Sequence, residues 1–207
     1  IKKIFKDEEF RFFSRMIFFS VLIVAVVIYT TVDLSASTSF NHPQVLGEVE
    51  SAIRHALFQI VAVVTTTGFV TADFTAWTPV LTVLFFALMF MGGSAGSTSG
   101  GIKGVRHYLM IKSGFLEFNR ALHPNAVLQI RYNKAVVQDN VIQNIYGFFI
   151  LYMLSFIIGT LGFSVLGLDF VSSIGVAASS LGNVGPALGD FGPAFSFNGL
   201  SMAGKWW

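Results

Sequence analysis

Two short stretches decide the fold: Thr65-Thr66-Thr67-Gly68-Phe69 and Ser180-Leu181-Gly182-Asn183-Val184-Gly185-Pro186. Each follows a short apolar segment, and in each case Asp-Phe comes five residues after the glycine, at Asp73-Phe74 and at Asp190-Phe191. The pattern G-x-x-x-x-D-F therefore occurs twice, at an offset of 117 residues. Because the order of the surrounding segments repeats as well, we predict an internal duplication.

Outside these loops, the composition is that of a membrane protein. Hydrophobic residues make up 54% of the 207 residues and charged residues only 12%, about half the share usual in a soluble domain. This argues against a cytosolic enzyme and against a disordered chain. The lack of cysteine excludes disulfides, thiolate metal sites and cysteine nucleophiles. A net charge of +2 is too small to indicate a nucleic-acid partner.

The basic residues gather in two segments. Five precede residue 16 and six lie between residues 103 and 134, which leaves only Arg54 and Lys205 outside them. The positive-inside rule places both segments in the cytoplasm. Three full spans between them would put them on opposite sides, so we predict that the middle apolar run, 56–72, enters and leaves by the same face. Non-helical backbone at that depth is tolerated only where it is buried in protein or lines water.

The two glycine loops suit a cation that exchanges its water shell for backbone carbonyl oxygens. Glycine opens φ/ψ regions in which the carbonyls can point toward one axis. A short helix that ends at the loop adds the negative end of its dipole. The simpler alternative is a helix that ends with a C′ glycine. One copy alone favours that alternative, whereas two copies in this topology favour a cation filter.

A second glycine-rich stretch, 92–101, follows an apolar helix expected from Pro79 to Met91, which reaches about 20 Å and so ends inside the membrane. It is not a phosphate loop, because Ile102 separates Gly101 from Lys103 and an apolar helix precedes it. We predict a flexible gate below the filter, and a packing interface of small residues is a compatible alternative. The residues assigned to the gate are Gly92, Gly93, Ser94, Gly96, Ser97, Thr98, Gly100 and Gly101.

These features predict an all-α integral membrane fold of repeated units, each with an outer helix, a re-entrant pore helix, a filter loop and an inner helix. The first repeat, 16–102, has its outer helix at 16–34, pore helix at about 48–64, filter at 65–69 and broken inner helix at 79–102. A cytoplasmic segment, 1–15, precedes it. A cytoplasmic connector, 103–139, follows it and is expected to be a helical hairpin that turns at His123-Pro124-Asn125. The second repeat, 140–207, has its outer helix at 140–168, pore helix at about 170–181 and filter at 182–186.

The N-terminal run is too long for a signal peptide, and acidic residues precede it. The sequence has no initiator methionine, and the second repeat stops where its inner helix should run. We therefore expect further parts of the protein beyond both ends.

The order of span, pore helix, T-T-G-F or N-V-G-P loop and inner helix resembles the Trk/Ktr/HKT superfamily of potassium transporters, which is similar to potassium channels. The strings 180–186 and 92–103 are most similar to the bacterial TrkH branch. The resemblance covers essentially the whole chain, as the third and fourth of four repeats. It implies potassium uptake through a gated pore, with half of one filter formed mainly by the backbone carbonyls of Thr66, Thr67, Gly68, Asn183, Val184 and Gly185. Only the first glycine of the channel pattern T-V-G-Y-G is kept, which leaves the strength of selectivity open.

The resemblance also implies the surroundings of the chain. It predicts a multi-pass protein of the bacterial inner membrane, in contact with lipid and with the remaining pore repeats of the same chain. A homodimer and a cytosolic regulatory ring that binds NAD or ATP are implied as partners, with the ring docking on the connector. K⁺ is the transported ion, and no bound cofactor is expected. No set of residues suggests catalysis, so any ATP or NAD dependence belongs to a partner.

Two other functions fit parts of the pattern. A secondary transporter of a small solute also uses broken helices and repeats, but it predicts an ionisable group inside the central spans, where the sequence has none. A structural membrane scaffold does not explain the paired loops. The four histidines are too far apart to form a metal site. Asp73 and Asp190 either attract cations or cap loops, and Arg54 is expected to pair with Glu48 or Glu50.

Overall fold

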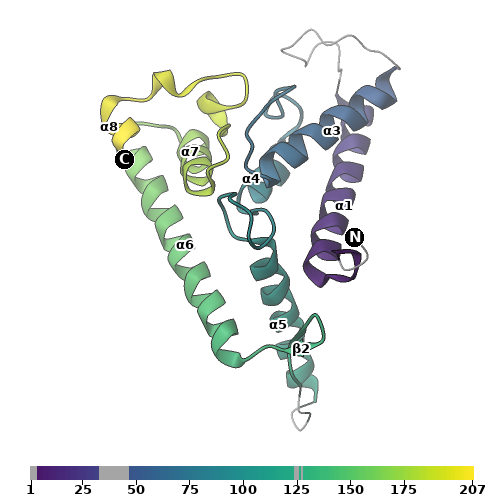
Figure 1. The fold of residues 1–207 in the computed structure, drawn as a ribbon. Coiled ribbons are helices and arrows are strands. Elements are labelled where there is room, and N and C mark those ends of the chain that lie inside the picture. Colours follow the sequence, from purple (N-terminus) through teal and green to yellow (C-terminus); the bar gives the residue numbers. More distant parts are fainter. Residues whose placement is uncertain (1–3, 33–46, 124–125, 127) are drawn as a thin grey trace.

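The computed structural model describes residues 4–32, 47–123, 126 and 128–207, and this part of the chain is mostly helical with little strand. Figure 1 shows two long helices, α1 (Glu8–Thr31) and α6 (Asp139–Val165), on opposite sides of the molecule. Both are long and apolar enough to cross a membrane, with 24 and 27 residues. A shorter helix packs on each of them: α3 (Glu48–Val64) on α1 and α7 (Phe170–Gly182) on α6.

Two further helices connect these pairs. Helix α4 (Pro79–Met89) contacts both α3 and α7, and helix α5 (Gly104–Leu122) contacts both α1 and α6. The glycine-rich segment lies between α4 and α5, near the centre of Figure 1. The remaining elements are short: η1 (Ile4–Lys6), β1 (Arg131–Tyr132), β2 (Ala135–Val136), η2 (Gly189–Phe191), η3 (Phe197–Gly199) and α8 (Met202–Trp206).

Helices α1, α4, α7 and α8 begin where a side chain accepts a hydrogen bond from one of the first free N–H groups. Asp169 caps α7 by accepting from the N–H groups of Val171 and Ser172 at 3.0 and 3.3 Å. Thr78 caps α4, and proline follows at its first position, where no N–H is needed. Helices α3 and α7 occupy nearly the same ranges as the two predicted short helices.

The expected start of the first long helix, residue 16, is wrong. Helix α1 begins at Glu8, because Asp7 accepts a hydrogen bond from the N–H of Phe10 at 3.0 Å and two acidic residues favour the first turn. It ends at Thr31, and the expected end at residue 34 lies outside the described residues.

The expected helical hairpin in the connector is wrong as well. Helix α5 is followed by a two-stranded antiparallel hairpin, in which Arg131 pairs with Val136 and Tyr132 with Ala135. The turn residues Asn133 and Lys134 both have positive φ, 47° and 70°, as a tight type I′ turn requires. Pro124 and Asn125, part of the expected turn, lie outside the described residues.

The main hydrophobic core lies between α1, α3 and α4. Phe74 and Phe85 are fully buried there and stack with ring centroids 4.4 Å apart. A second core lies between α6 and α7, where Phe191 stacks on Phe197 at 5.5 Å. The phenylalanines of the two Asp-Phe pairs, Phe74 and Phe191, are therefore both buried anchors, each after its glycine loop.

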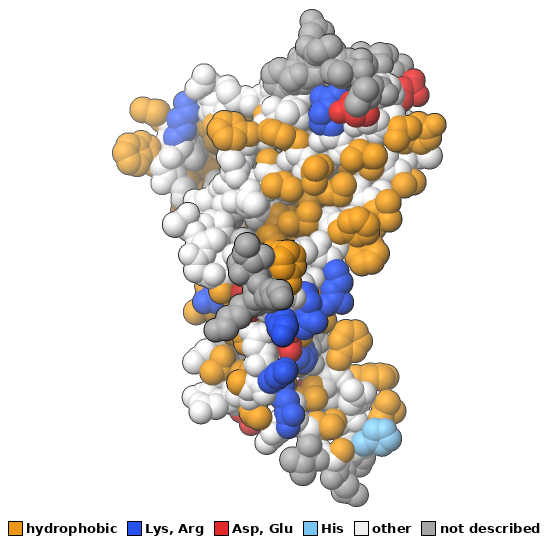
Figure 2. All heavy atoms as spheres, turned by 45° about the vertical axis from the view of Figure 1, so that its right-hand side comes forward, with side chains coloured by type: hydrophobic (Ala, Val, Ile, Leu, Met, Phe, Trp, Pro, Cys, Tyr) orange, Lys and Arg blue, Asp and Glu red, His pale blue; other side chains and the backbone are white. Residues whose placement is uncertain are grey.

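Much apolar surface remains exposed on the long helices. Leu22 and Ile23 on α1 and Leu151 and Leu161 on α6 are at least half exposed. Figure 2 shows hydrophobic side chains grouped over the upper half of one face, with Lys and Arg side chains gathered below them. Exposed apolar surface of this extent is typical of helices that face lipid or another protein segment.

Candidate filter and gate

The two glycine loops have the same backbone conformation. Just after α3, Thr66 has φ 54°, and just after α7, Asn183 has φ 52°. Two residues further on, Gly68 has φ 72° and Gly185 has φ 109°. Both pairs of positive φ angles are separated by the same 117 residues as the repeated sequence pattern. The first left-handed residue after each helix is thus threonine or asparagine, so Gly68 and Gly185 are not the capping glycines of the simpler alternative.

The hydrogen bonds at the two helix ends repeat as well. The N–H of Thr67 donates to the carbonyl of Ala62 at 2.9 Å, and the N–H of Val184 donates to that of Ser179 at 3.0 Å. One residue earlier, the N–H groups of Thr66 and Asn183 donate three residues back, at 3.0 and 3.3 Å. These matched bonds satisfy the last carbonyls of each helix in the same way. The internal duplication therefore extends from the sequence to the backbone.

The two loops touch each other, and glycine is required at the contact. A Cβ atom on Gly68 would overlap the carbonyl oxygen of Val184, well inside the 3.0 Å that real Cβ contacts respect. On the other side, a Cβ on Gly185 would lie 3.6 Å from the Cα of Gly68. A cavity of about 440 Å³ opens here, and its lining includes Thr66, Thr67, Asn183, Val184 and Gly185. The structure thus brings together all six residues predicted for the filter.

Side-chain hydroxyl groups hold each loop in place. The Ser179 hydroxyl donates to the carbonyl of Gly185 at 2.9 Å and accepts from its N–H at 3.1 Å. In the first loop, the Thr65 hydroxyl lies 2.6 Å from the carbonyl of Val61 and 2.7 Å from the Thr67 hydroxyl. These bonds hold the backbone of both loops without any charged group.

The glycine-rich segment is a loop closed by a narrow neck. The N–H of Gly92 donates to the carbonyl of Ile102 at 2.8 Å, and the N–H of Ile102 donates to that of Phe90 at 3.1 Å. A third bond joins the N–H of Gly104 to the carbonyl of Gly93, also at 3.1 Å. The neck thus joins the end of α4 directly to the start of α5.

This loop lies directly against the filter loops. The N–H of Gly100 donates to the Thr66 hydroxyl at 3.2 Å. A Cβ on Gly100 would overlap the carbonyl oxygen of Gly182 and would lie 2.9 Å from the side-chain nitrogen of Asn183. All eight residues predicted for the gate belong to this loop or its neck, and Gly100 is its point of contact with the ends of α3 and α7.

Two charged side chains that the sequence did not single out also hold the loop. Glu9, buried at the start of α1, accepts a hydrogen bond from the N–H of Ala95 at 2.6 Å. The Lys103 ammonium donates to oxygens of Ser97 and Ser99. Glu9 lies 86 residues before its partner, and its only sequence signal is an acidic group close to an apolar run.

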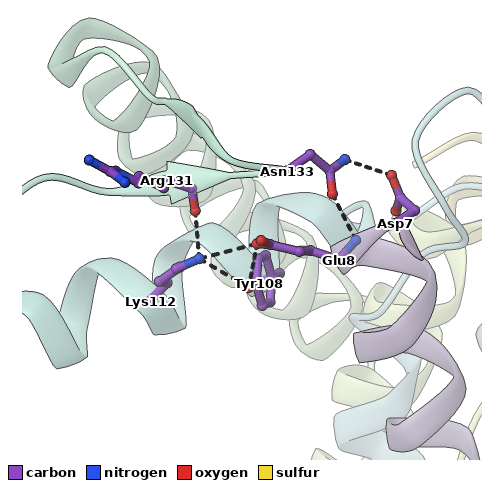
Figure 3. A network of polar contacts seen from close by, with 6 residues as sticks. All are labelled: Asp7, Glu8, Tyr108, Lys112, Arg131 and Asn133. Atoms are coloured by element: carbon purple, nitrogen blue, oxygen red, sulfur yellow. Dashed lines mark hydrogen bonds and ion pairs between the residues drawn. The ribbon is translucent and has the colours of Figure 1, made fainter. Parts of the chain in front are cut away.

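A polar network joins the start of α1 to α5 and the hairpin (Figure 3). Glu8 accepts from the Tyr108 hydroxyl at 2.7 Å and from Lys112 at 3.1 Å. Asn133 bridges the same helix end, accepting from the N–H of Glu8 at 2.9 Å and donating to Asp7 at 2.7 Å. The hydrogen bond from the Phe10 N–H and that from Asn133 lower the pKa of Asp7. The connector is thereby tied to the helix that carries Glu9.

The remaining candidates have ordinary structural partners. Arg54 pairs with Glu50 at 2.8 Å, one of the two partners expected for it. Asp73 accepts a hydrogen bond from the N–H of Thr75 at 2.9 Å, which is the capping role. Asp190 is exposed. Within the described residues, no three His, Asp or Glu side chains form a group that could hold a metal ion.

Known proteins are similar to this chain over most of its length. The family model described as "TrkH: Cation transport protein" matches residues 3–205. The chain is 36% identical to the Trk system potassium uptake protein TrkH of Halomonas elongata and 34% identical to that of Escherichia coli K12. Each match covers 82% of this chain and 32% of the relative. The E. coli protein TrkG is 32% identical, with 86% of this chain and 34% of the relative covered.

A solved structure has the same fold. The crystal structure of the potassium transporter TrkH from Vibrio parahaemolyticus matches with a TM-score of 0.84 and 33% identity. The match covers 99% of this chain and 41% of the transporter chain. The chain thus spans about a third of the length of the curated relatives that it matches. It belongs to the TrkH family of cation transport proteins.

Proposed function

We propose that this chain forms half of a channel-like pore for potassium uptake across the bacterial inner membrane. The observation that carries the proposal is the pair of touching glycine loops, which share their backbone angles, hydrogen bonds and spacing. The relatives named as potassium uptake proteins match the chain over most of its length. The rest of the pore would come from the remaining repeats of the same full-length chain.

In this proposal, the carbonyls of Thr66, Thr67, Gly68, Asn183, Val184 and Gly185 replace part of the ion's water shell. Helices α3 and α7 end at these loops, so the negative ends of their dipoles face the ion. Uncharged oxygens bind a monovalent cation strongly enough to admit it and weakly enough to release it. The six residues act mainly through their backbone carbonyls. Replacing one of the two glycines should therefore disturb ion binding more than exchanging the side chain of another filter residue.

The loop from residue 92 to 101 is the proposed gate. Its contact with Thr66 and with the end of α7 supports a closed position against the filter, and its narrow neck supports movement as a unit. The loop has no hydrophobic core of its own and is held by small residues and by the side chains of Glu9 and Lys103. It can therefore leave the filter loops at a low cost in free energy. The packing alternative is compatible, because Gly92 and Gly100 also allow close backbone contact.

The surroundings of the chain are part of the proposal. Its basic segments would lie in the cytoplasm, and the apolar faces of α1 and α6 would contact lipid or the other repeats. The full-length protein would form a homodimer and bind a cytosolic ring that recognises NAD or ATP, which docks near α5 and the hairpin. The chain would carry K⁺ without catalysing a reaction, without a bound cofactor and without a nucleic-acid partner. A solute transporter would need a charged or readily ionisable group in the central spans, and residues 16–31 and 140–165 contain no Asp, Glu, Lys, Arg or His.

The filter is tested by Gly68→Ser and Gly185→Ser in the full-length protein. Each should lower the ratio of rubidium to sodium flux, because serine strains the left-handed backbone and displaces carbonyl ligands. Gly147→Ser is the control, since this glycine lies in α6 with open space around it. Unchanged ratios in both filter variants would refute the assignment.

The gate is tested separately by trimming residues 96–100. Uptake should rise while the rubidium-to-sodium ratio stays the same. Unchanged uptake, or loss of folding alone, would favour the packing alternative.

A further inference from the structure

The ammonium of Lys103 lies within a set of uncharged oxygens on the glycine-rich loop. It donates to the carbonyl of Ser97 at 2.9 Å, to the hydroxyl of Ser97 at 3.3 Å and to the hydroxyl of Ser99 at 3.1 Å. The carbonyl of Ser99 is a fourth and shorter contact. Within the described part of the chain, Lys103 pairs with no carboxylate. The hydrogen bonds of its ammonium there all go to oxygens of two serines.

The loop itself orients these oxygens. The Ser97 hydroxyl donates to the carbonyl of Ser94 at 2.7 Å, and the Ser99 hydroxyl accepts from the N–H of Gly93 at 2.8 Å. The two hydroxyl oxygens lie 2.8 Å apart, so the Ser99 proton can point to Ser97. In that arrangement both hydroxyl oxygens keep lone pairs toward the ammonium. The oxygen set is thus organised by Ser94 and Gly93, without help from Lys103.

The number of oxygens fits a spherical ion better than an ammonium group. Lysine has three N–H donors, so four oxygens cannot each receive a hydrogen bond of their own. A monovalent metal ion has no such directional limit and takes carbonyl and hydroxyl oxygens of this kind. The set also lies on the exposed side of the loop at Ser97, close to Gly100, which contacts the filter loops.

We propose that Ser97 and Ser99 form a second monovalent-cation site of potassium size, which Lys103 occupies as a tethered substitute while the loop is docked. The ammonium then ties the loop to the start of α5 and keeps a free ion out of this position. When the side chain leaves, a permeating ion can take its place. The consequence for transport rests on the proposed gate, whereas the site itself is a property of the loop.

The test uses Lys103→Met in the full-length protein, with a nitroxide label on Thr98→Cys. Thr98 is exposed between the two serines, and no hydrogen bond of its side chain is present in the described structure. Spin-label mobility is measured in potassium chloride and in N-methylglucamine chloride, whose cation is too large for the site. Lys134→Met is the matched control, because this exposed lysine lies in the hairpin turn, away from the loop.

We expect the label to be more mobile in Lys103→Met than in the parent when only N-methylglucamine is present. Potassium should restore the lower mobility in Lys103→Met, and it should change neither the parent nor Lys134→Met. Losing charge-assisted hydrogen bonds should shift the docked-to-undocked ratio by about tenfold or more. If Lys103→Met does not fold, Lys103→Gln allows the same comparison, since its amide has only two donors and no charge.

Equal mobility of Lys103→Met and the parent would overturn the proposal. The proposal would also be overturned if the label in Lys103→Met were equally mobile in potassium chloride and in N-methylglucamine chloride. Lys103 would then hold the loop without replacing a cation. Rubidium uptake by the same proteins separates this result from the proposed function. A parent that carries no potassium or rubidium would refute the pore, whereas the potassium-dependent mobility of the loop would still establish the cation site.

Discussion

Gly100 offers a way to displace the gate from the filter with one methyl group. Its φ is not in the left-handed range, so alanine fits its backbone without strain. Its Cβ, however, would overlap the carbonyl oxygen of Gly182 and would lie 2.7 Å from the carbonyl carbon of the same residue. Gly100→Ala should therefore act as a wedge that moves the loop away from the ends of α3 and α7.

The size of the effect follows from two contributions. Overpacking at a tight contact costs about 1–3 kcal/mol. The hydrogen bond from the Gly100 N–H to Thr66, already 3.2 Å long, would break as the loop moves, at a cost of about 1 kcal/mol. Together they disfavour the docked loop by about 2–4 kcal/mol, which is roughly thirtyfold or more in the docked-to-undocked ratio.

Rubidium uptake into liposomes that contain the full-length protein measures this change. We expect Gly100→Ala to take up rubidium faster than the parent, with the same preference for rubidium over sodium, because the filter loops are not altered. Gly114→Ala is the control. It lies in α5 beyond the loop with open space around it, and should only stabilise the helix, by about 0.5–1 kcal/mol. Folded Gly100→Ala with unchanged or slower uptake would refute the docked-gate reasoning, and altered selectivity would show that the methyl group acts on the filter.

Three further predictions concern the same structure. Gly68→Ala should lower the thermal midpoint more than Gly185→Ala, because both have positive φ but only the first adds an overlap with Val184; equal midpoints would contradict the loop contact. Thr66→Val removes the hydroxyl that accepts from Gly100, so rubidium uptake should rise at unchanged selectivity, and slower uptake would argue against this tether. The pKa of Asp7 is lowered by its hydrogen bonds in the folded state, so its stabilising effect is present above its unfolded pKa and is lost as the pH falls below about 4. The thermal midpoint of Asp7→Asn, which keeps the helix cap, should therefore fall less than that of the parent between about pH 5 and pH 3, and parallel profiles would contradict this origin.

The sequence was sufficient for the elements that carry a local signal. The short helices α3 and α7 were predicted because an apolar segment ends at a polar-glycine loop in both copies. The break after α4 was predicted because glycine and serine replace the apolar residues from Gly92 onward. The spacing of 117 residues between the loops, which rests on local pattern alone, reappears in the backbone angles of Thr66 and Asn183.

Other features depend on partners that are distant in sequence. The first eight residues of α1 fall within the predicted cytoplasmic segment 1–15, before the expected start of the helix, but Asp7 caps the helix and Glu9 is buried against the loop. The hairpin at Asn133-Lys134 could have been found from its two-residue turn, yet its strands are only two residues long. The role of Lys103 could not be predicted, because it follows from how the loop folds back on Ser97 and Ser99.

The most direct test of the account is rubidium and sodium uptake into liposomes that contain the full-length protein, with and without excess unlabelled potassium. The account predicts rubidium flux that potassium competes away and sodium flux that is far slower. Folded protein that carries no cation, or that carries sodium as fast as rubidium, would contradict the potassium pore.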